Sequence, residues 1–183
     1  AKLDGLHAVA MPAGVLASML PVFFPGEHVL ANAGSPAFRA HFIIAMLAYS
    51  LFTLAALHAM LMAVAARQLH TARFSRALSS LPPLLTMEAL LFRLIGIAFI
   101  LLTLTLASGI AFSETLFGQA FRLDHKTVFA VISWLLFGAL LVGRRVWGWR
   151  GRIALRWTLA GFLALMLAYV GSRFVVEVLL QRA

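Results

Sequence analysis

Long apolar runs separated by short polar stretches dominate the chain. A helix that crosses a bilayer needs roughly 20 apolar residues. Five runs reach or approach that length, and they cover Leu6–Phe24, Phe38–Ala66, Met87–Phe112, Lys126–Gly143 and Ile153–Leu180. The second would be about 43 Å long as a helix, so it must tilt or project from the membrane. This pattern predicts an all-α integral membrane protein with five transmembrane helices.

Composition supports this class. Of the 183 residues, 63% are hydrophobic and only 11% are charged, whereas soluble domains average about 25% charged residues. The net charge of +9 need not indicate nucleic acid, because basic residues cluster in two short connections, as expected for the cytoplasmic loops of a membrane protein. The absence of cysteine excludes thiolate metal sites and covalent haem attachment through a C-x-x-C-H motif. The bilayer is therefore the first expected partner.

The distribution of basic residues predicts the orientation of the helices. Nine lysines and arginines lie on the side of the loops 67–86 and 143–152, and four lie on the other side. Basic loops are retained in the cytoplasm, so we expect both Arg-rich loops there, in a bacterial inner membrane. His41 and His125 then start helices near the same external face.

The first residue is Ala rather than Met, and no signal peptide is visible. We therefore expect a part of a longer protein whose upstream helices are absent. Residues 1–183 would form a single transmembrane domain, with a core at 38–180.

His41 stands at the head of a stripe of mostly small residues, and two interpretations are open. The stripe favours either close helix packing or room for a flat ligand, and a neutral imidazole can bind haem iron. The residues that share this helical face are Ala45, Ala48, Phe52, Ala55, Ala59 and Ala66.

Other polar residues in or near the apolar runs also carry two interpretations. Arg173 could pair with Glu177 one turn away or clamp a carboxylate such as a haem propionate. His58 would lie roughly 25 Å deeper than His41 and is expected to hydrogen-bond a neighbouring helix, with a second haem site as the alternative.

The stretch "RLDHKTVFAVI" begins the fourth apolar run. Asp124 could cap the helix by accepting backbone N–H bonds, with Lys126 reaching the headgroups. No Ser/His/Asp triad, P-loop or H-E-x-x-H spacing is present. We therefore expect no enzyme activity.

The stretch "RLIGIAFILLTLTLASGIAFSETLFGQAFRLDHKTVFAVISW" resembles the tryptophan-rich region of the CcsA/CcmC/CcmF haem-handling proteins of cytochrome c assembly. Their pattern is close to "S-G-x-x-W-x-x-x-x-W-G-x-Y-W-x-W-D-P-K". Five positions match without a gap: Ser108, Gly109, Gly118, Asp124 and Lys126.

Departures from the pattern are also specific. Aromatic or apolar residues replace the family's tryptophans at Phe112, Phe117, Phe121 and Leu123, and His125 replaces its proline. Upstream, "AHFIIAMLAYS" resembles the family's "H-x-x-x-x-x-x-x-Y" helix and places His41 on a haem-ligating histidine. The family's second external histidine has no counterpart in "VVEVLLQRA".

The segments "LPPLLTMEALLFR", "GWRGR" and "AYVGSRFV" are most similar to the HemX/YpjD-like branch of this family, whose members resemble an eight-helix protein. The resemblance implies a membrane protein that binds or passes haem b near the external face, in haem transport or cytochrome biogenesis. Its expected partners are haem and another membrane or biogenesis protein.

In the implied site, His41 and His125 would ligate iron. The phenyl rings of Phe112, Phe117 and Phe121 would pack on the macrocycle. The charged residues of the site would be Asp124, Lys126 and Arg173, with Lys126 or Arg173 meeting the propionates. The alternative is a haem-free membrane scaffold or regulator that retains the fold, favoured by the lost tryptophans and the missing histidine.

Overall fold

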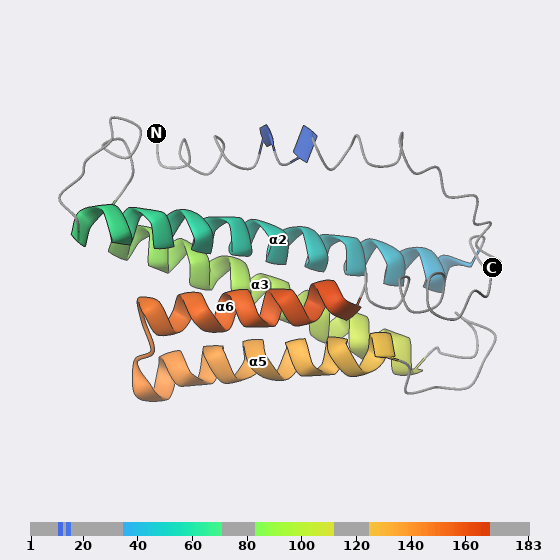
Figure 1. The fold of residues 1–183 in the computed structure, drawn as a ribbon. Coiled ribbons are helices and arrows are strands. Elements are labelled where there is room, and N and C mark those ends of the chain that lie inside the picture. The colour runs from blue at the N-terminus through green and yellow to red at the C-terminus, as the bar shows by residue number, and fades with distance from the viewer. Residues whose placement is uncertain (1–10, 13, 16–34, 71–82, 112–124, 169–183) are drawn as a thin grey trace.

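A bundle of antiparallel helices makes up the described part of the chain, which in this computed structural model comprises residues 11–12, 14–15, 35–70, 83–111 and 125–168. Its main helices are α2 (Pro36–His70), α3 (Leu84–Ala111), α5 (His125–Trp147) and α6 (Arg152–Met166). Figure 1 shows that each runs opposite to the one before it, so that the start of α2, the end of α3 and the start of α5 share one end of the bundle. In the bundle, α2 packs on α3 and α6, and α5 packs on the same two helices.

Three of these helices are long and apolar enough to cross a membrane: Pro36–Gln68, Leu84–Ala111 and Lys126–Trp147. They correspond to the second, third and fourth predicted runs, and the all-α prediction is confirmed for the described residues. The first run and the second half of the fifth lie largely outside those residues. The count of five transmembrane helices therefore stays a prediction.

The helices extend past the approximate bounds of the predicted runs at more than one end; α2, for example, continues to His70 rather than ending at Ala66. The fourth run does not end at Gly143, because α5 continues to Trp147 and leaves only residues 148–151 between α5 and α6. Arg144 and Arg145 lie in the last turn, where cations are favourable for a helix. The helix stops at Gly148, whose φ of 66° is a left-handed conformation that glycine adopts easily.

Close packing explains the stripe on α2. Ala48, Phe52, Ala55 and Ala59 are all fully buried, and α2 makes its most extensive contact with α3. Small side chains allow two helices to approach each other closely where lipid supplies no hydrophobic driving force between them. The packing interpretation is therefore confirmed for the middle of the stripe, and no space for a flat ligand exists there.

A pair of stacked aromatic rings joins α2 to α5, and α6 packs against one of these rings through Gly161. The rings of Phe52 and Phe137 are 4.1 Å apart between centroids, and both are fully buried. A Cβ added at Gly161 would come within 2.9 Å of the Phe137 ring. The Ser133 hydroxyl donates to the Gly161 carbonyl at 2.9 Å. Gly161 is thus a point of close approach between α5 and α6.

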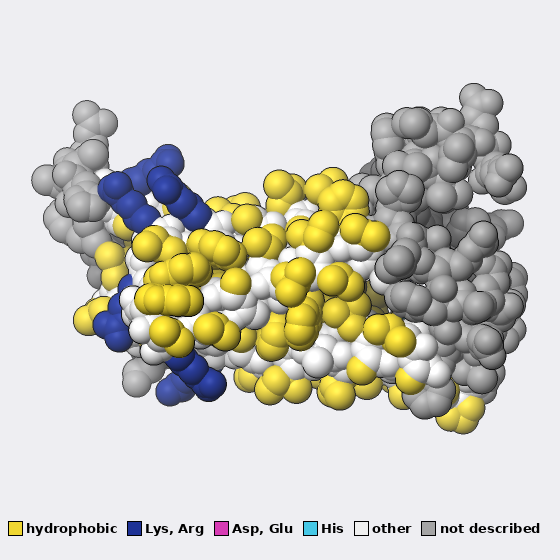
Figure 2. Space-filling view, turned by 90° about the horizontal axis from the view of Figure 1, so that it is seen from below, with side chains coloured by type: hydrophobic (Ala, Val, Ile, Leu, Met, Phe, Trp, Pro, Cys, Tyr) yellow, Lys and Arg dark blue, Asp and Glu magenta, His cyan; other side chains and the backbone are white. Residues whose placement is uncertain are grey.

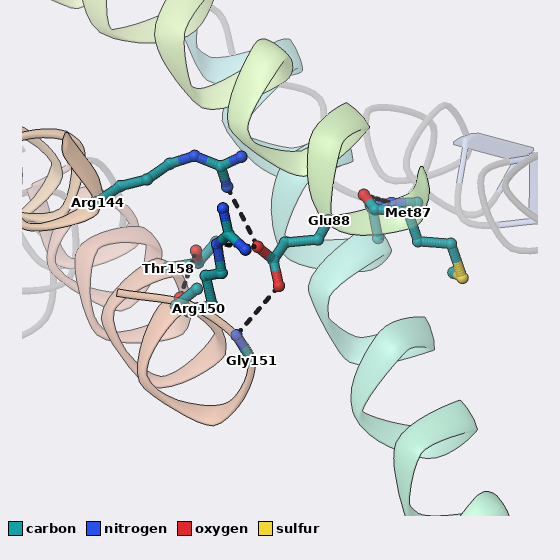
Figure 3. Close-up of polar contacts among 8 residues, drawn as sticks. Met87, Glu88, Arg144, Arg150, Gly151 and Thr158 are labelled. Carbon is teal, nitrogen blue, oxygen red and sulfur yellow. Dashed lines mark hydrogen bonds and ion pairs between the residues drawn. The ribbon is translucent and has the colours of Figure 1, made fainter. Parts of the chain in front are cut away.

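Glu88 connects α3 to the turn between α5 and α6 (Figure 3). Its carboxylate accepts hydrogen bonds from the Arg144 guanidinium at 3.3 Å and from the Gly151 N–H at 3.2 Å. The Arg150 Nε lies 3.8 Å away. The Arg144 guanidinium carbon also lies 3.7 Å from the centre of the Phe92 ring, a cation–π arrangement. One buried carboxylate therefore holds the turn against α3.

Replacing Gly161 with Ala should destabilise the protein by about 1–3 kcal/mol, because the Phe137 ring is confined by Phe52 and cannot move aside freely. Thermal unfolding in detergent measures this change. Gly96→Ala is the matched control, since a Cβ there meets nothing within 4 Å and should stabilise the helix by about 0.5–1 kcal/mol. Equal unfolding temperatures for the two variants would contradict the packing described for Gly161.

Replacing Glu88 with Gln should lower the free energy of unfolding by about 1.5–3 kcal/mol, because the hydrogen bonds to Arg144 and Gly151 lose their charged acceptor. The same thermal measurement applies. Arg93→Gln removes an exposed charge from the same helix and should change stability by about 0.5 kcal/mol or less. A Glu88→Gln variant as stable as that control would show that the carboxylate does not hold the turn.

Candidate functional site

His41 lies near the start of α2 and meets the last turns of α3. Its Nδ1 is 2.7 Å from the Ser108 hydroxyl oxygen, although the two residues are 67 positions apart in the chain. The contact arises because α2 begins at the end of the bundle where α3 finishes (Figure 1). The His41 side chain is half-buried, at the edge of the stripe rather than within it.

The Ser108 hydroxyl lies between two possible acceptors, the Thr105 carbonyl at 3.1 Å and His41 Nδ1 at 2.7 Å. It carries one proton, so it accepts from one neighbour when it donates to the other. When that proton goes to Thr105, the imidazole proton is on Nδ1 and the lone pair is on Nε2. Metal-binding histidines usually have this arrangement, in which one ring nitrogen donates to a protein oxygen and the other faces the metal.

Gly109 lies beside the same imidazole. A Cβ built at this position would be 3.6 Å from His41 Cε1, which is ordinary van der Waals contact, so a long side chain there would crowd the ring. Ser108 therefore orients the His41 ring through a hydrogen bond, and Gly109 leaves room at the edge of the ring because it has no side chain. Both residues match the family motif in the sequence, but the motif does not predict that they lie next to His41.

Lys126 is exposed in the first turn of α5, and the start of α5 lies at the same end of the bundle as the start of α2 (Figure 1). The prediction that the start of α5 lies on the same side as His41 is therefore confirmed. His125 is the first residue of α5, but its side chain lies outside the described residues. The same is true of Phe112, Phe117, Phe121, Asp124 and Arg173, and their roles remain predictions.

His58 lies deeper in α2 and is buried. Its Nε2 is 2.9 Å from the Met87 carbonyl oxygen on α3, which confirms the expected hydrogen bond to a neighbouring helix. Its Nδ1 is buried and has no hydrogen-bond partner. Within the described residues, no three or more His, Asp or Glu side chains gather into a group that could hold a metal ion. The described site thus centres on one imidazole, that of His41.

Comparisons with known proteins agree with the earlier resemblance. The family profile described as Cytochrome C assembly protein matches residues 4–180. Inner membrane protein YpjD of Escherichia coli strain K12 is 32% identical over 160 residues, which are 87% of this chain and 60% of YpjD. The cytochrome c biogenesis protein CcsA of Gloeobacter violaceus is 31% identical over 92 residues, 50% of this chain and 27% of that protein.

The chain thus spans about 60% of the length of the YpjD relative that it matches. A second CcsA, from Picosynechococcus, is 34% identical over 86 residues, 47% of this chain and 25% of that protein. No solved structure matches the chain.

Proposed function

This chain belongs to the Cytochrome C assembly protein family, and on that basis we propose that it binds or passes haem b at the end of the bundle where His41 lies. Its role would be haem transport or cytochrome biogenesis, and it would require no covalent catalysis. The whole protein would act in a bacterial inner membrane, with residues 67–86 and 143–152 on the cytoplasmic side. The name of the YpjD relative and the apolar helices support this location.

The observation that carries the proposal is the contact between His41 and Ser108. An imidazole whose Nδ1 proton is directed to a serine oxygen is prepared to donate the Nε2 lone pair to iron. His41 also matches the haem-ligating histidine of the family pattern, and Ser108 and Gly109 match its first two letters. The residues that lie together in the structure, His41, Ser108 and Gly109, are therefore also residues that match the family pattern.

Packing restricts where haem could bind. Ala48, Phe52 and Ala55 are fully buried between helices, so a macrocycle could not extend along the stripe. It would lie at the end of the bundle, next to Gly109 and the segment 112–124 that follows α3. That segment contains Phe112, Phe117 and Phe121, which would pack on the macrocycle.

The remaining residues of the proposed haem site are either charged side chains or a candidate iron ligand. Lys126 or Arg173 would pair with the propionates, and Asp124 and His125 would complete the site, with His125 as the second axial ligand. Bound haem would supply a redox-active iron, and the chain's own residues would hold and orient it.

A haem-free scaffold or regulator is the second candidate, and the buried stripe favours it. A family member whose helices close tightly below His41 needs no ligand to fill its interior. Its partner would then be another membrane protein, and purified preparations would be colourless.

We expect the chain purified in detergent from haem-replete cells to show a Soret band, and His41→Ala to abolish or strongly reduce it because the axial nitrogen is lost. The absorption spectrum measures this directly. His125→Ala should weaken the band if His125 is the second ligand. His70→Ala changes the last residue of α2, at the opposite end of that helix from His41; it is the control and should leave the band unchanged. A colourless wild type that also fails to take up added haem would refute haem binding.

Ser108→Ala should lower haem affinity by roughly tenfold or more, because partners that orient a ligating histidine contribute 10–100-fold to metal affinity. Haem titration measures the dissociation constant, and the position of the Soret band reports the iron environment. Ser108→Thr keeps a hydroxyl and should recover most of the affinity. If Ser108→Ala binds haem as the wild type does, with an unchanged spectrum, Ser108 does not position His41.

A further inference from the structure

The turn between α5 and α6 presents an arginine-rich surface that the haem proposal does not use. Arg145, Arg150, Arg152 and Arg156 are all exposed around this turn. Figure 2 shows Lys and Arg side chains gathered at one end of the bundle, beyond a surface of hydrophobic side chains. We call residues 145–156 the arginine turn.

These arginines have no carboxylate of their own in the described part of the chain. Glu88 is the only Asp or Glu there, and it is buried and accepts hydrogen bonds from Arg144 and the Gly151 N–H. Arg150 lies 3.8 Å from the same carboxylate, but its side chain is 66% exposed. The positive charge that faces outward is therefore left for an anion from outside the described bundle.

Apolar side chains are exposed directly beside this charge. Val142, Val146 and Ile153 are exposed, and Trp147 is 67% exposed where the membrane-spanning part of α5 ends. Indole rings favour the interface between headgroups and acyl chains. The surface is thus apolar on the bundle side and cationic at its end.

Arg156 lies on the outward face of α6, one turn inside the helix. It shares that face with Ile153, Ala160, Leu163 and Leu167, all of which are exposed. An arginine on a lipid-facing stripe is costly unless its guanidinium reaches a polar or anionic group at the interface. A ligand for this surface must therefore offer both an acyl chain and an anionic head.

We infer that the arginine turn binds anionic phospholipids, with headgroup phosphates on Arg152 and Arg156 and acyl chains against Val146, Trp147 and Ile153. Guanidinium groups bind phosphate oxygens in a bidentate manner. A soluble acidic protein or a nucleic acid would satisfy the charge but would leave the apolar half of the surface unused. This inference is independent of whether haem binds at the other end of the bundle.

The test is native mass spectrometry of the full chain in detergent, with equal additions of phosphatidylglycerol and phosphatidylcholine. Wild type should retain phosphatidylglycerol preferentially, and more strongly at low salt. Arg152→Gln/Arg156→Gln should reduce that retention about thirtyfold, because each arginine near an anionic membrane surface contributes about 1 kcal/mol. Arg152→Lys/Arg156→Lys keeps the charge and should retain an intermediate amount. Arg39→Gln removes an exposed arginine at the opposite end and should change nothing.

Three results would overturn the inference. One is equal retention of the two lipids by wild type, a measurement that needs no variant. The second is an equal loss with Arg39→Gln, which would reveal unspecific charge attraction. The third is displacement of phosphatidylglycerol from the arginine turn by poly-glutamate at equal concentration, which would point to an acidic protein partner. Circular dichroism confirms that the variants compared are folded.

Discussion

The small side chains on one face of α2 are the constraint on which the rest of the structure depends. Ala48, Ala55 and Ala59 are fully buried, and they allow α3 to approach closely along most of its length. Only at that short distance can His41 reach Ser108 and His58 reach the Met87 carbonyl. In lipid, where apolar surfaces gain little by meeting each other, such contacts decide which helices associate. The proposed haem ligand is thus oriented by packing that lies deeper in the bundle.

The two ends of the bundle have different chemistry, and the packed middle separates them. One end brings together an imidazole, a serine, a glycine and the Lys126 charge, all from helix termini. The other end gathers arginines, tryptophans and one buried carboxylate around a four-residue turn. Between them lie Phe52, Phe137 and Gly161, which leave no space for a ligand. Binding events at the two ends can therefore be studied separately by substitutions that leave the middle intact.

The pattern of apolar and polar residues along the chain was enough to predict the main helices and one polar contact between them. Apolar runs located α2, α3 and α5, because a membrane helix must be apolar over its whole length, and the position of His58 in α2 indicated its bond to a neighbouring helix. The end of α5 was missed, because Gly143 resembles a stop while the left-handed residue is Gly148. The partners of Glu88 lie 56 and 63 positions away. Local periodicity carries no information about pairs so far apart in the chain. The contact between His41 and Ser108 could not be predicted for the same reason, since these residues are 67 positions apart.

Those separations also bear on how the protein is made. Synthesis proceeds from the N-terminus, so Glu88 leaves the ribosome before Arg144 and Gly151 exist. Until the hairpin of α5 and α6 arrives, the carboxylate near the start of α3 must stay in contact with water or headgroups, because a lone charge is not stable in the hydrocarbon. Arrival of the hairpin supplies the guanidinium and the backbone N–H together. Assembly of this end is therefore completed only after α5 and α6, which are made later than α3, have joined the bundle.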